Sequence, residues 1–332
     1  MAKKQRIITV TGATGFVGRH LVARLVEERG YKVRCLVRRE SDLSQLRQLS
    51  AGLDFVYGDI TQRETLVDAF QGCWGVINLA GYREFWSQHR EHFYDINERG
   101  AINVFEACRE AGVAKVVQVS TPLAFGLPDQ LPFNEASAAG QHASDYAHSK
   151  YLGDQAGWRL HEREGLPLTI VHLAAVIGAG DDKSTMEVRR AVEGKLPALV
   201  GADTTYTYLY VRDAAEAVTR ALVKEDSIGQ RYLIGNQRAT TREYFNTIGR
   251  LASVSVPHWN IPEAWLMPVA RGMDVISRRT GRRPLLPLDV LKTTAAGSLL
   301  FDATRSIKEL GMRYTPLETA LAESIDEIRA AA

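Results

Sequence analysis

Near its start the sequence reads Ile7-Ile-Thr-Val-Thr11-Gly12-Ala-Thr-Gly15-Phe-Val-Gly18, which joins a run of β-branched residues to a segment of helical periodicity ending at Glu28. We predict a strand over residues 7–10, a glycine-rich turn, and a helix over 17–28. Gly12 permits the tight turn, Gly15 lets the backbone approach a pyrophosphate, and Gly18 lets the helix pack closely on the strand. Because amides at the helix N-terminus then face phosphate groups, we predict a dinucleotide-binding turn. Its expected cofactor-binding residues are Gly12, Thr14, Gly15, Phe16, Val17 and Gly18.

Further along the chain, short apolar runs alternate with longer segments of helical periodicity. The next expected strands are Val33–Val37, Phe55–Tyr57, Val76–Leu79, Val116–Val119 and Leu168–Val171, and a long helix is expected over Glu91–Ala111. The runs lack polar alternation, so helices should cover both faces of each strand. We therefore predict an α/β fold with a doubly wound parallel sheet of the Rossmann type.

The alternation becomes less regular after about residue 180, where prolines become more frequent. We predict a dinucleotide-binding domain over residues 1–180 and a smaller, mainly helical substrate-binding lobe over 181–332. Strands near Tyr206–Val211 and Tyr232–Ile234 are expected to return to the main sheet. In the lobe, one stripe of a predicted helix over 262–276 carries Trp265, Val269, Met273 and Ile276. We favour a helix that covers the substrate pocket over one that touches a membrane.

Composition and charge exclude several classes of protein. The 332 residues include 41 Lys and Arg against 39 Asp and Glu, a net charge of +2. A surface so close to neutral lacks the basic field that binds nucleic acid. No apolar run approaches the ~18 to 20 residues of a membrane span, and the apolar start is interrupted too early for a signal peptide. Three scattered cysteines favour a reducing compartment, so we expect a cytoplasmic protein.

The choice of cofactor depends on the residues that end the second expected strand. Arg38 stands 20 residues after Gly18, where an acidic residue would bind the adenosine ribose of NAD, and Arg39 follows it. A guanidinium pairs instead with the 2′-phosphate of NADP. We therefore prefer NADP(H) as the cofactor, with NAD(H) as the alternative. Asp59 and Ile60, after the third strand, are expected to line the adenine.

A tyrosine and a lysine carry the expected chemistry. In Tyr146-Ala-His-Ser-Lys150 the phenol and the ammonium are four residues apart, so a helix places both on one face. The nearby cation favours the phenolate, which makes Tyr146 usable as an acid or a base. Ser120 and Thr121 follow an expected strand, where a hydroxyl can hold the carbonyl oxygen that Tyr146 protonates.

These motifs, in this order, resemble the extended short-chain dehydrogenases/reductases of the NAD(P)-dependent epimerase/dehydratase superfamily. Further matching segments are Asn78-Leu-Ala-Gly81, Asn97 with Gly100, Val211-Arg-Asp213 and Tyr232-Leu-Ile-Gly235. The resemblance implies that Tyr146 is the general acid/base and that Lys150 holds the nicotinamide ribose and lowers the tyrosine pKa. It implies that Thr121, rather than Ser120, orients the substrate oxygen, and that Asn97 supports a proton-relay water. It also implies cofactor contacts from Leu79, Ala80 and Gly81.

One segment departs from the family pattern. Where the family commonly has Arg-Pro after the sixth strand, this chain has His172-Leu173. Backbone contacts from Leu173 through Val176 to the nicotinamide are still expected.

Aromatic residues at the expected carboxyl edge of the sheet are candidates for substrate contact. Tyr82, Phe85 and Trp86 follow the fourth strand and form either a substrate wall or packing for the lobe. The expected substrate residues are Tyr82, Trp86, Phe125 and Tyr206. His89 and His92 are three residues apart on a predicted helix, but no carboxylate or cysteine completes a ligand set, so no metal is expected.

Two enzyme reactions fit the resemblance. The first is reduction of a ketone or aldehyde, or the reverse oxidation, as in the dihydroflavonol reductase and 3β-hydroxysteroid dehydrogenase-like branch. The second is epimerisation or dehydration of a nucleotide sugar with a retained cofactor. Tyr206 stands where such enzymes usually have a diphosphate-binding arginine, and Pro122-Leu123 stands where dehydratases have an acid pair. Both favour the first reaction on a small or apolar substrate, although Arg313 could still contact a phosphate.

Two further possibilities remain. A non-catalytic protein that senses NADP(H) is a minor alternative, because such proteins typically lose the tyrosine or the lysine. The family often dimerises through two long helices, here Glu91–Ala111 and Tyr146–Glu164, so a homodimer is possible by analogy.

Overall fold

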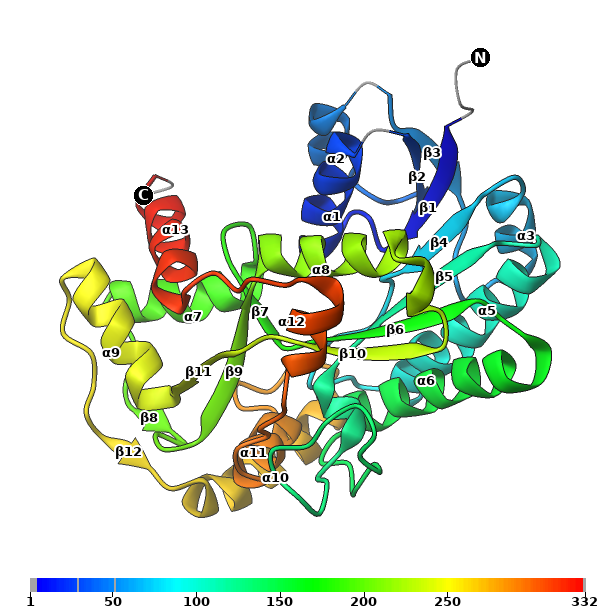
Figure 1. Ribbon diagram of the computed structural model, residues 1–332. Coiled ribbons are helices and arrows are strands. Elements are labelled where there is room, and N and C mark those ends of the chain that lie inside the picture. The colour runs from blue at the N-terminus through cyan, green and yellow to red at the C-terminus, as the bar shows by residue number, and fades with distance from the viewer. Residues whose placement is uncertain (1–4, 29, 51, 331–332) are drawn as a thin grey trace.

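A seven-stranded sheet lies at the centre of the computed structural model, which describes residues 5–28, 30–50 and 52–330. Its strand order is β10-β6-β5-β4-β1-β2-β3 (Figure 1), and every neighbouring pair is parallel. The strands are β1 (Arg6–Thr11), β2 (Tyr31–Val37), β3 (Asp54–Tyr57), β4 (Gly75–Asn78), β5 (Lys115–Ser120), β6 (Leu168–Leu173) and β10 (Gln230–Ile234). The predicted doubly wound parallel sheet is confirmed.

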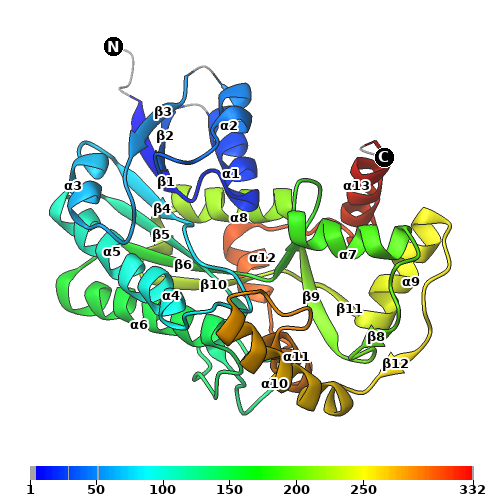
Figure 2. The ribbon, with the colours of Figure 1, turned by 180° about the vertical axis from the view of Figure 1, so that it is seen from behind.

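Helices cover both faces of this sheet. One face carries α1 (Phe16–Glu27), α8 (Val211–Val223) and α12 (Thr304–Leu310), with the short α2 (Ser44–Leu49) beside α1. The other face carries α3 (Glu64–Phe70), α5 (Gly100–Glu110) and α6 (Asp145–Glu164), as Figure 2 shows. Two 3₁₀ turns, η2 (Pro122–Phe125) and η3 (Glu225–Ser227), follow β5 and α8.

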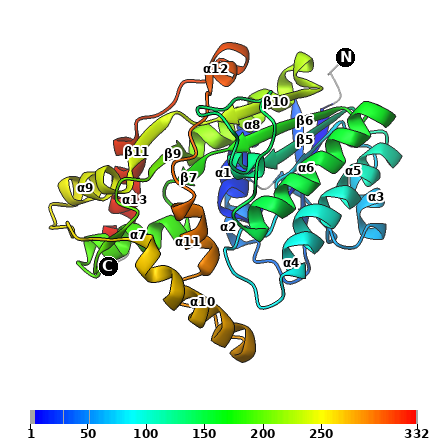
Figure 3. The same cartoon turned by 90° about the horizontal axis from the view of Figure 1, so that it is seen from below.

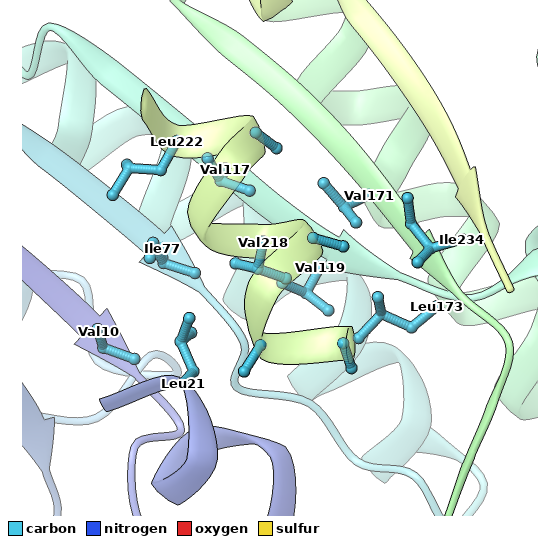
Figure 4. Packing of buried hydrophobic residues seen from close by; sticks show 14 of the residues in the cluster. Val10, Leu21, Ile77, Val117, Val119, Val171, Leu173, Val218, Leu222 and Ile234 are labelled. Atoms are coloured by element: carbon cyan, nitrogen blue, oxygen red, sulfur yellow. The ribbon is translucent and has the colours of Figure 1, made fainter. Parts of the chain in front are cut away.

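The core between α8 and the sheet explains why these strands read as unbroken apolar runs. Val218 and Leu222 of α8 are fully buried and point toward Ile77, Val117 and Val119 of the strands (Figure 4). Burial of each such side chain stabilises the fold by roughly 1.5–3 kcal/mol. Helices α5 and α6 bury the opposite face, so the strands in the middle of the sheet are buried on both faces.

The long helix expected over residues 91–111 is interrupted. It begins as α4 (Glu91–Tyr94), passes through a π-helical turn η1 (Asp95–Arg99) and continues as α5. A π turn inserts one extra residue into the helix and is frequent at functional sites. This one contains Asn97, whose side chain is buried.

A second group of elements packs beside the carboxyl end of the main sheet. It holds a three-stranded sheet of β7 (Ala175–Ile177), β9 (Thr205–Tyr210) and β11 (Gln237–Thr240), and a pair of short strands, β8 (Leu199–Val200) and β12 (Asn260–Ile261). Its helices are α7 (Asp182–Val192), α9 (Thr241–Ala252), α10 (Glu263–Thr280), α11 (Leu288–Ala295) and α13 (Leu317–Ala330).

The two predicted returns to the main sheet have different outcomes. The strand near 232–234 is confirmed, because β10 pairs with β6 at the sheet edge. The strand near 206–211 is placed wrongly by the sequence, because β9 pairs with β7 and β11 in the smaller sheet. Residues 207–210 of β9 are all buried, so both faces of this strand are covered within the smaller sheet.

Helix α10 also differs from expectation. Of the stripe expected to face a pocket, Trp265, Val269 and Ile276 are exposed to solvent, while Ala270 and Ser277 are buried. The periodicity correctly predicted which side of the helix is apolar. It did not predict that this side would face solvent. Within the residues that the structure describes, no helix combines the length and apolarity needed to cross a membrane.

Candidate active site

The glycine turn between β1 and α1 has the geometry that the sequence predicts. Gly12 has φ +68°, a left-handed conformation, and a Cβ there would stand 2.8 Å from the backbone nitrogen of Ala80. A Cβ on Gly18 would collide with the carbonyl groups of Gly12 and Ala13. Gly15 is the N-cap of α1, whose first turn contains no acidic residue. The turn thus presents amides at a helix N-terminus that is favourable for an anion.

A buried polar chain fixes the carboxyl ends of three neighbouring strands. The Thr11 hydroxyl donates to Asn78 (2.7 Å), and the Asn78 amide donates to Gln118 (2.8 Å). The backbone amides of Leu79 and Ala80 donate to the same Thr11 hydroxyl, at 3.2 and 3.0 Å. The segment that follows β4 is therefore held directly beside the glycine turn.

Tyr146 and Thr121 meet at the carboxyl end of β5. Ser144 caps α6 by accepting a hydrogen bond from the amide of Ala147 (3.2 Å), so Tyr146 lies in the first turn of the helix. The side chain of Thr121 lies close enough to this phenol to lower its pKa, and the Thr121 hydroxyl accepts a hydrogen bond from the amide of Leu123 (3.3 Å). Lys150, one turn further along, is buried and donates from Nζ to the carbonyl of Val119 (2.9 Å). Tyr146, Thr121 and Lys150 thus lie near the carboxyl end of β5, with the ammonium directed to the strand backbone.

The pKa of Tyr146 moves in the direction opposite to the sequence expectation. Burial raises the pKa of Tyr146 to about 12. The charge of Arg83 and the side chain of Thr121 both lower this pKa, but by less than burial raises it. Burial likewise lowers the pKa of Lys150, against the attraction of Asp154. With Nζ directed to a carbonyl, the ammonium does not offset the burial of the phenol.

Asn97 joins the segment after β4 to α6. Its Oδ1 accepts from the amide of Tyr82 (2.8 Å), and its Nδ2 donates to the carbonyl of Tyr82 and the hydroxyl of Ser149, both at 3.0 Å. These bonds hold the backbone that enters the site. The role in a proton relay that the resemblance implies stays a prediction.

Beneath Tyr146 lies a buried polar group that sequence reasoning missed. Ser120 donates a hydrogen bond to Oδ2 of Asp154, and Nδ1 of His172 lies 3.8 Å from the same oxygen. Nδ1 of His172 also contacts the carbonyl of Thr121 at 3.2 Å, so it supports the backbone of the residue beside Tyr146. A signal was present, because Asp154 lies one helical turn after Lys150 and His172 marks the departure from the family pattern.

Burial is the largest influence on the pKa values of Asp154 and His172. It raises the pKa of Asp154 to about 6, opposed by Lys150 and by the bond from Ser120. It lowers the pKa of His172 to about 3, so the imidazole is neutral at physiological pH. A cavity of about 130 Å³ adjoins both residues and is also bordered by Phe125 and Arg231.

The residues expected around the adenine directly follow β2 and β3. Arg38 and Arg39 are exposed at the carboxyl end of β2; Arg38 pairs with Glu40 (3.2 Å), and Arg39 lies over the ring of Tyr57. Asp59 accepts from the amide and hydroxyl of Thr61. Ile60 is buried against Gly100, where a Cβ would stand 2.8 Å from its Cδ1.

The expected substrate residues divide into three environments. Tyr82 packs edge-on against Phe93, and the indole of Trp86 donates to Asp274 of α10 (3.1 Å). Phe125 is only 4% exposed and packs against Phe133 and His172, which gives it a place in the core. Tyr206 contacts the hydroxyl of Thr294 in α11 (3.1 Å).

Two residues that follow Tyr82 in the chain, Arg83 and Phe85, act on the phenol of Tyr146. Phe85 packs edge-on against the ring of Tyr146, with centroids 5.9 Å apart. The charge of Arg83 acts on the same phenol, and its guanidinium pairs with Asp181 (2.7 Å). The sequence did carry a signal for Arg83, a lone cation between aromatic residues at the carboxyl edge of the sheet.

Leu173 and Val176 lie at the carboxyl end of β6 and in β7. Leu173 is buried and Val176 is partly exposed. Across residues 5–28, 30–50 and 52–330, no cluster of three or more His, Cys, Asp and Glu side chains is arranged to hold a metal ion.

Comparison with known proteins places this geometry in a family. The sequence profile of the NAD dependent epimerase/dehydratase family matches residues 8–235, more than half of the chain. The chain belongs to this family and is an NAD(P)-dependent enzyme of the extended short-chain dehydrogenase/reductase type.

The relatives include reductases and epimerases. A Synechocystis protein provisionally named a dihydroflavonol 4-reductase is 29% identical, over 95% of this chain and 92% of the relative. "Sterol demethylase protein B" of Methylococcus capsulatus is 28% identical, over 95% and 96%. The crystal structure of gox2253 is similar at a TM-score of 0.83, with 30% identity over 99% of both chains. A UDP-glucuronic acid 4-epimerase from Bacillus cereus, solved with UDP-glucuronic acid and NAD, shares the fold at a TM-score of 0.79, with 19% identity over 98% and 100%.

Proposed function

We propose that this enzyme interconverts a carbonyl and an alcohol on a small or apolar organic substrate, using NADP(H) and a proton carried by Tyr146. The observation that carries the proposal is the position of the Thr121 side chain beside the phenol of Tyr146, with Lys150 one turn away. A carbonyl oxygen held between the two hydroxyls accepts a hydrogen bond from each. Tyr146 then donates its proton to that oxygen, or accepts one in the reverse direction.

The residues of the glycine turn suit a dinucleotide. Gly12, Thr14, Gly15, Phe16, Val17 and Gly18 would hold its pyrophosphate, and Leu79, Ala80, Gly81, Leu173 and Val176 would flank the nicotinamide. When bound, the nicotinamide supplies or accepts the hydride, and its oxidised ring carries a positive charge. Lys150 would bind the ribose through Nζ and favour the tyrosinate, which counteracts the raised pKa of Tyr146.

The preference for NADP(H) rests on Arg38 and Arg39. Both side chains are exposed at the carboxyl end of β2, next to the turn that would hold the pyrophosphate. The exposed pair of Arg38 with Glu40 is weak, so a phosphate can replace the carboxylate. Asp59 and Ile60 would lie against the adenine.

The alternative is a nucleotide-sugar epimerase or dehydratase with retained NAD(P), since such enzymes share this fold. Tyr206 occupies the place of their diphosphate-binding arginine, and its hydroxyl is engaged with Thr294. Conversion of UDP- or dTDP-sugars without net change in NADPH absorbance would favour the alternative. Binding of NADPH without turnover on any substrate would favour a sensing protein.

Replacing Tyr146 by Phe tests the proposed proton transfer. The change keeps the ring against Phe85 and removes only the hydroxyl, so NADPH affinity should persist. Turnover of ketone substrates should fall by about 10² to 10⁴. Tyr151→Phe, on the same helix, is the matched control and should retain turnover. A Tyr146→Phe enzyme with normal turnover would contradict this mechanism.

Some expectations remain predictions. Residues 1–180 would bind the cofactor together with β10, and residues 181–332 would mainly bind the substrate. A homodimer through α5 and α6, and a cytoplasmic location, also stay predictions.

A further inference from the structure

Helix α10 presents an apolar face to solvent. Trp265 is 75% exposed, Val269 50%, Val275 52% and Ile276 62%. At 100° per residue these four side chains fall on one side of the helix, together with Pro268 and Gly272. We call Trp265, Val269, Val275 and Ile276 the α10 face. A surface helix normally turns its apolar stripe to the core, so this orientation is the reverse of the usual one.

The opposite side of α10 fixes this orientation. Ala270 and Ser277 are buried, and Asp274 accepts hydrogen bonds from the indole of Trp86 (3.1 Å) and from Arg278 (2.8 Å). A rotation of the helix that buried the α10 face would break the bond from Trp86 and expose Asp274. Figure 3 shows α10 at the margin of the molecule, where it extends away from the helices that cover the sheet.

The charges around the α10 face have one predominant sign. Residues 263–283 contain five arginines and two carboxylates, Glu263 and Asp274, and Asp274 is turned inward. In the part of the chain that the structure describes, Arg271, Arg279 and Arg282 are exposed and have no carboxylate partner. The apolar face is thus bordered by unneutralised positive charge, which complements an anionic surface.

Further exposed apolar side chains lie at both ends of the helix. Trp259, before α10, is 80% exposed, and Leu285, after it, is 91% exposed. Tryptophan with flanking arginine is the composition of segments that lie in the interface of a bilayer, where the ring enters the headgroup region and the cation meets phosphate.

We propose that the α10 face docks on an anionic phospholipid surface, with Trp265 and Ile276 inserted and Arg271, Arg279 and Arg282 against the headgroups. A second copy of the chain fits less well, because pairing two α10 faces brings their arginines together. Docking would place the membrane beside the segment 83–88, which α10 contacts through Trp86 and which packs on Tyr146 through Phe85. The proposal does not depend on the substrate, because its test measures binding.

Vesicle co-sedimentation with the full chain tests the proposal. Vesicles of phosphatidylcholine with phosphatidylglycerol should sediment the protein, and phosphatidylcholine alone should sediment it much less. Added salt should weaken binding to the anionic vesicles, because salt screens the arginines. Absence of binding to anionic vesicles at low salt would overturn the proposal.

Paired variants separate the apolar and the charged contributions. Trp265→Ser with Ile276→Ser should weaken binding about tenfold or more, whereas Ile307→Ser, an exposed apolar residue on α12, should have no effect. Arg271→Gln, Arg279→Gln and Arg282→Gln together should abolish the preference for anionic lipid, and the equal charge change at Arg47, Arg159 and Arg163 should preserve it. Equal loss in both sets would show only a net-charge effect and reject the docking site.

Two further readouts locate the contact. Brominated lipids should quench tryptophan fluorescence in the wild type and much less in Trp265→Phe, which keeps an aromatic ring and most of the binding. Sedimentation velocity should show no change in association state between the wild type and the Trp265→Ser, Ile276→Ser variant. A wild-type dimer that dissociates in this variant would assign the α10 face to a second copy instead.

Discussion

Ser120 and Thr121 are neighbours at the end of β5, yet their hydroxyls have different partners. Ser120 donates to the buried Asp154, whereas the Thr121 hydroxyl accepts from the amide of Leu123 (3.3 Å) and lies beside the phenol of Tyr146. From position alone the sequence could not separate them, and only the resemblance favoured Thr121. The contact with Tyr146 follows from the fold, because the start of α6 lies over the carboxyl end of β5 and not over its middle.

Arg38 decides the cofactor preference in our proposal. Arg38→Asp places a carboxylate where the 2′-phosphate of NADPH would bind, so NADPH should be weakened far more than NADH. The ratio of the two dissociation constants, measured by fluorescence titration before and after the change, checks this. Arg47→Asp alters the same charge on the nearby α2 and should leave the ratio unchanged. An unchanged ratio in Arg38→Asp would place the phosphate elsewhere.

His172 should make the fold sensitive to acid. Its pKa is lowered to about 3 by burial, so between pH 6.5 and 3 the unfolded chain binds the proton that the folded chain excludes. Its contribution to stability is therefore complete above pH 6.5 and decreases as the pH falls toward 3. At pH 5 the loss amounts to about 2 kcal/mol.

The variant His172→Gln isolates this contribution. An amide can still donate to the carbonyl of Thr121 but does not titrate. The difference in unfolding free energy between wild type and variant, from urea titrations, should shrink by about 2 kcal/mol between pH 7 and pH 5. A difference that stays constant with pH would show that His172 is not buried in its neutral form.

Among the helices and strands, the sequence predicted the elements that follow a regular periodicity and missed the features that depend on local structure. The apolar runs located the strands of the main sheet up to β6, and the glycine spacing located the first turn. The π turn at 95–99 was not predictable, because one inserted residue leaves the helical periodicity almost unchanged. The exposed face of α10 was not predictable either, because a periodic stripe shows which side is apolar and not whether the core covers it.

Helix α6 approaches the π turn so closely that only glycine fits between them. A Cβ on Gly153 would collide with the carbonyl of Asn97. Gly153→Ala should therefore displace α6 from η1, disturb Asn97 and Lys150, and destabilise the fold by about 1–3 kcal/mol. Turnover should fall with it. Thermal unfolding and steady-state assays check both expectations.

Gly272 provides the matched control for this variant. It is also a glycine inside a helix, but a Cβ there meets nothing within 4 Å. Gly272→Ala should stabilise the protein by up to about 1 kcal/mol through better helix propensity. If Gly153→Ala were stabilised as much as Gly272→Ala, helix propensity would outweigh any clash with the carbonyl of Asn97, and the close packing inferred at Gly153 would be wrong.

At the scale of the molecule, the main sheet is assembled from distant parts of the chain. Its edge strand β10 and the covering helix α8 come from residues 211–234, after the smaller sheet has begun. The family profile also ends at residue 235, directly after β10. A division of the chain at residue 180 therefore cuts through one core, which holds Val171 of β6 and Val218 of α8 together.

A fragment of residues 1–180 should consequently fail to fold. It would leave β6 without a neighbour on one side and expose the apolar face of β4, β5 and β6 that α8 covers. We expect no cooperative urea transition by far-UV circular dichroism, in contrast to the full chain. A soluble fragment with a sharp transition would show that the first 180 residues form an independent folding unit.

The late arrival of β10 also has a consequence for synthesis. Between the end of β6 at Leu173 and the end of β10 at Ile234 the ribosome adds 61 residues. At about 5–20 residues per second this takes roughly 3–12 seconds. For most of that interval the nascent chain carries three apolar strands, β4, β5 and β6, whose covering helix α8 is still incomplete. This protein is therefore expected to need a chaperone on the ribosome more than a fold of the same size whose sheet closes in chain order.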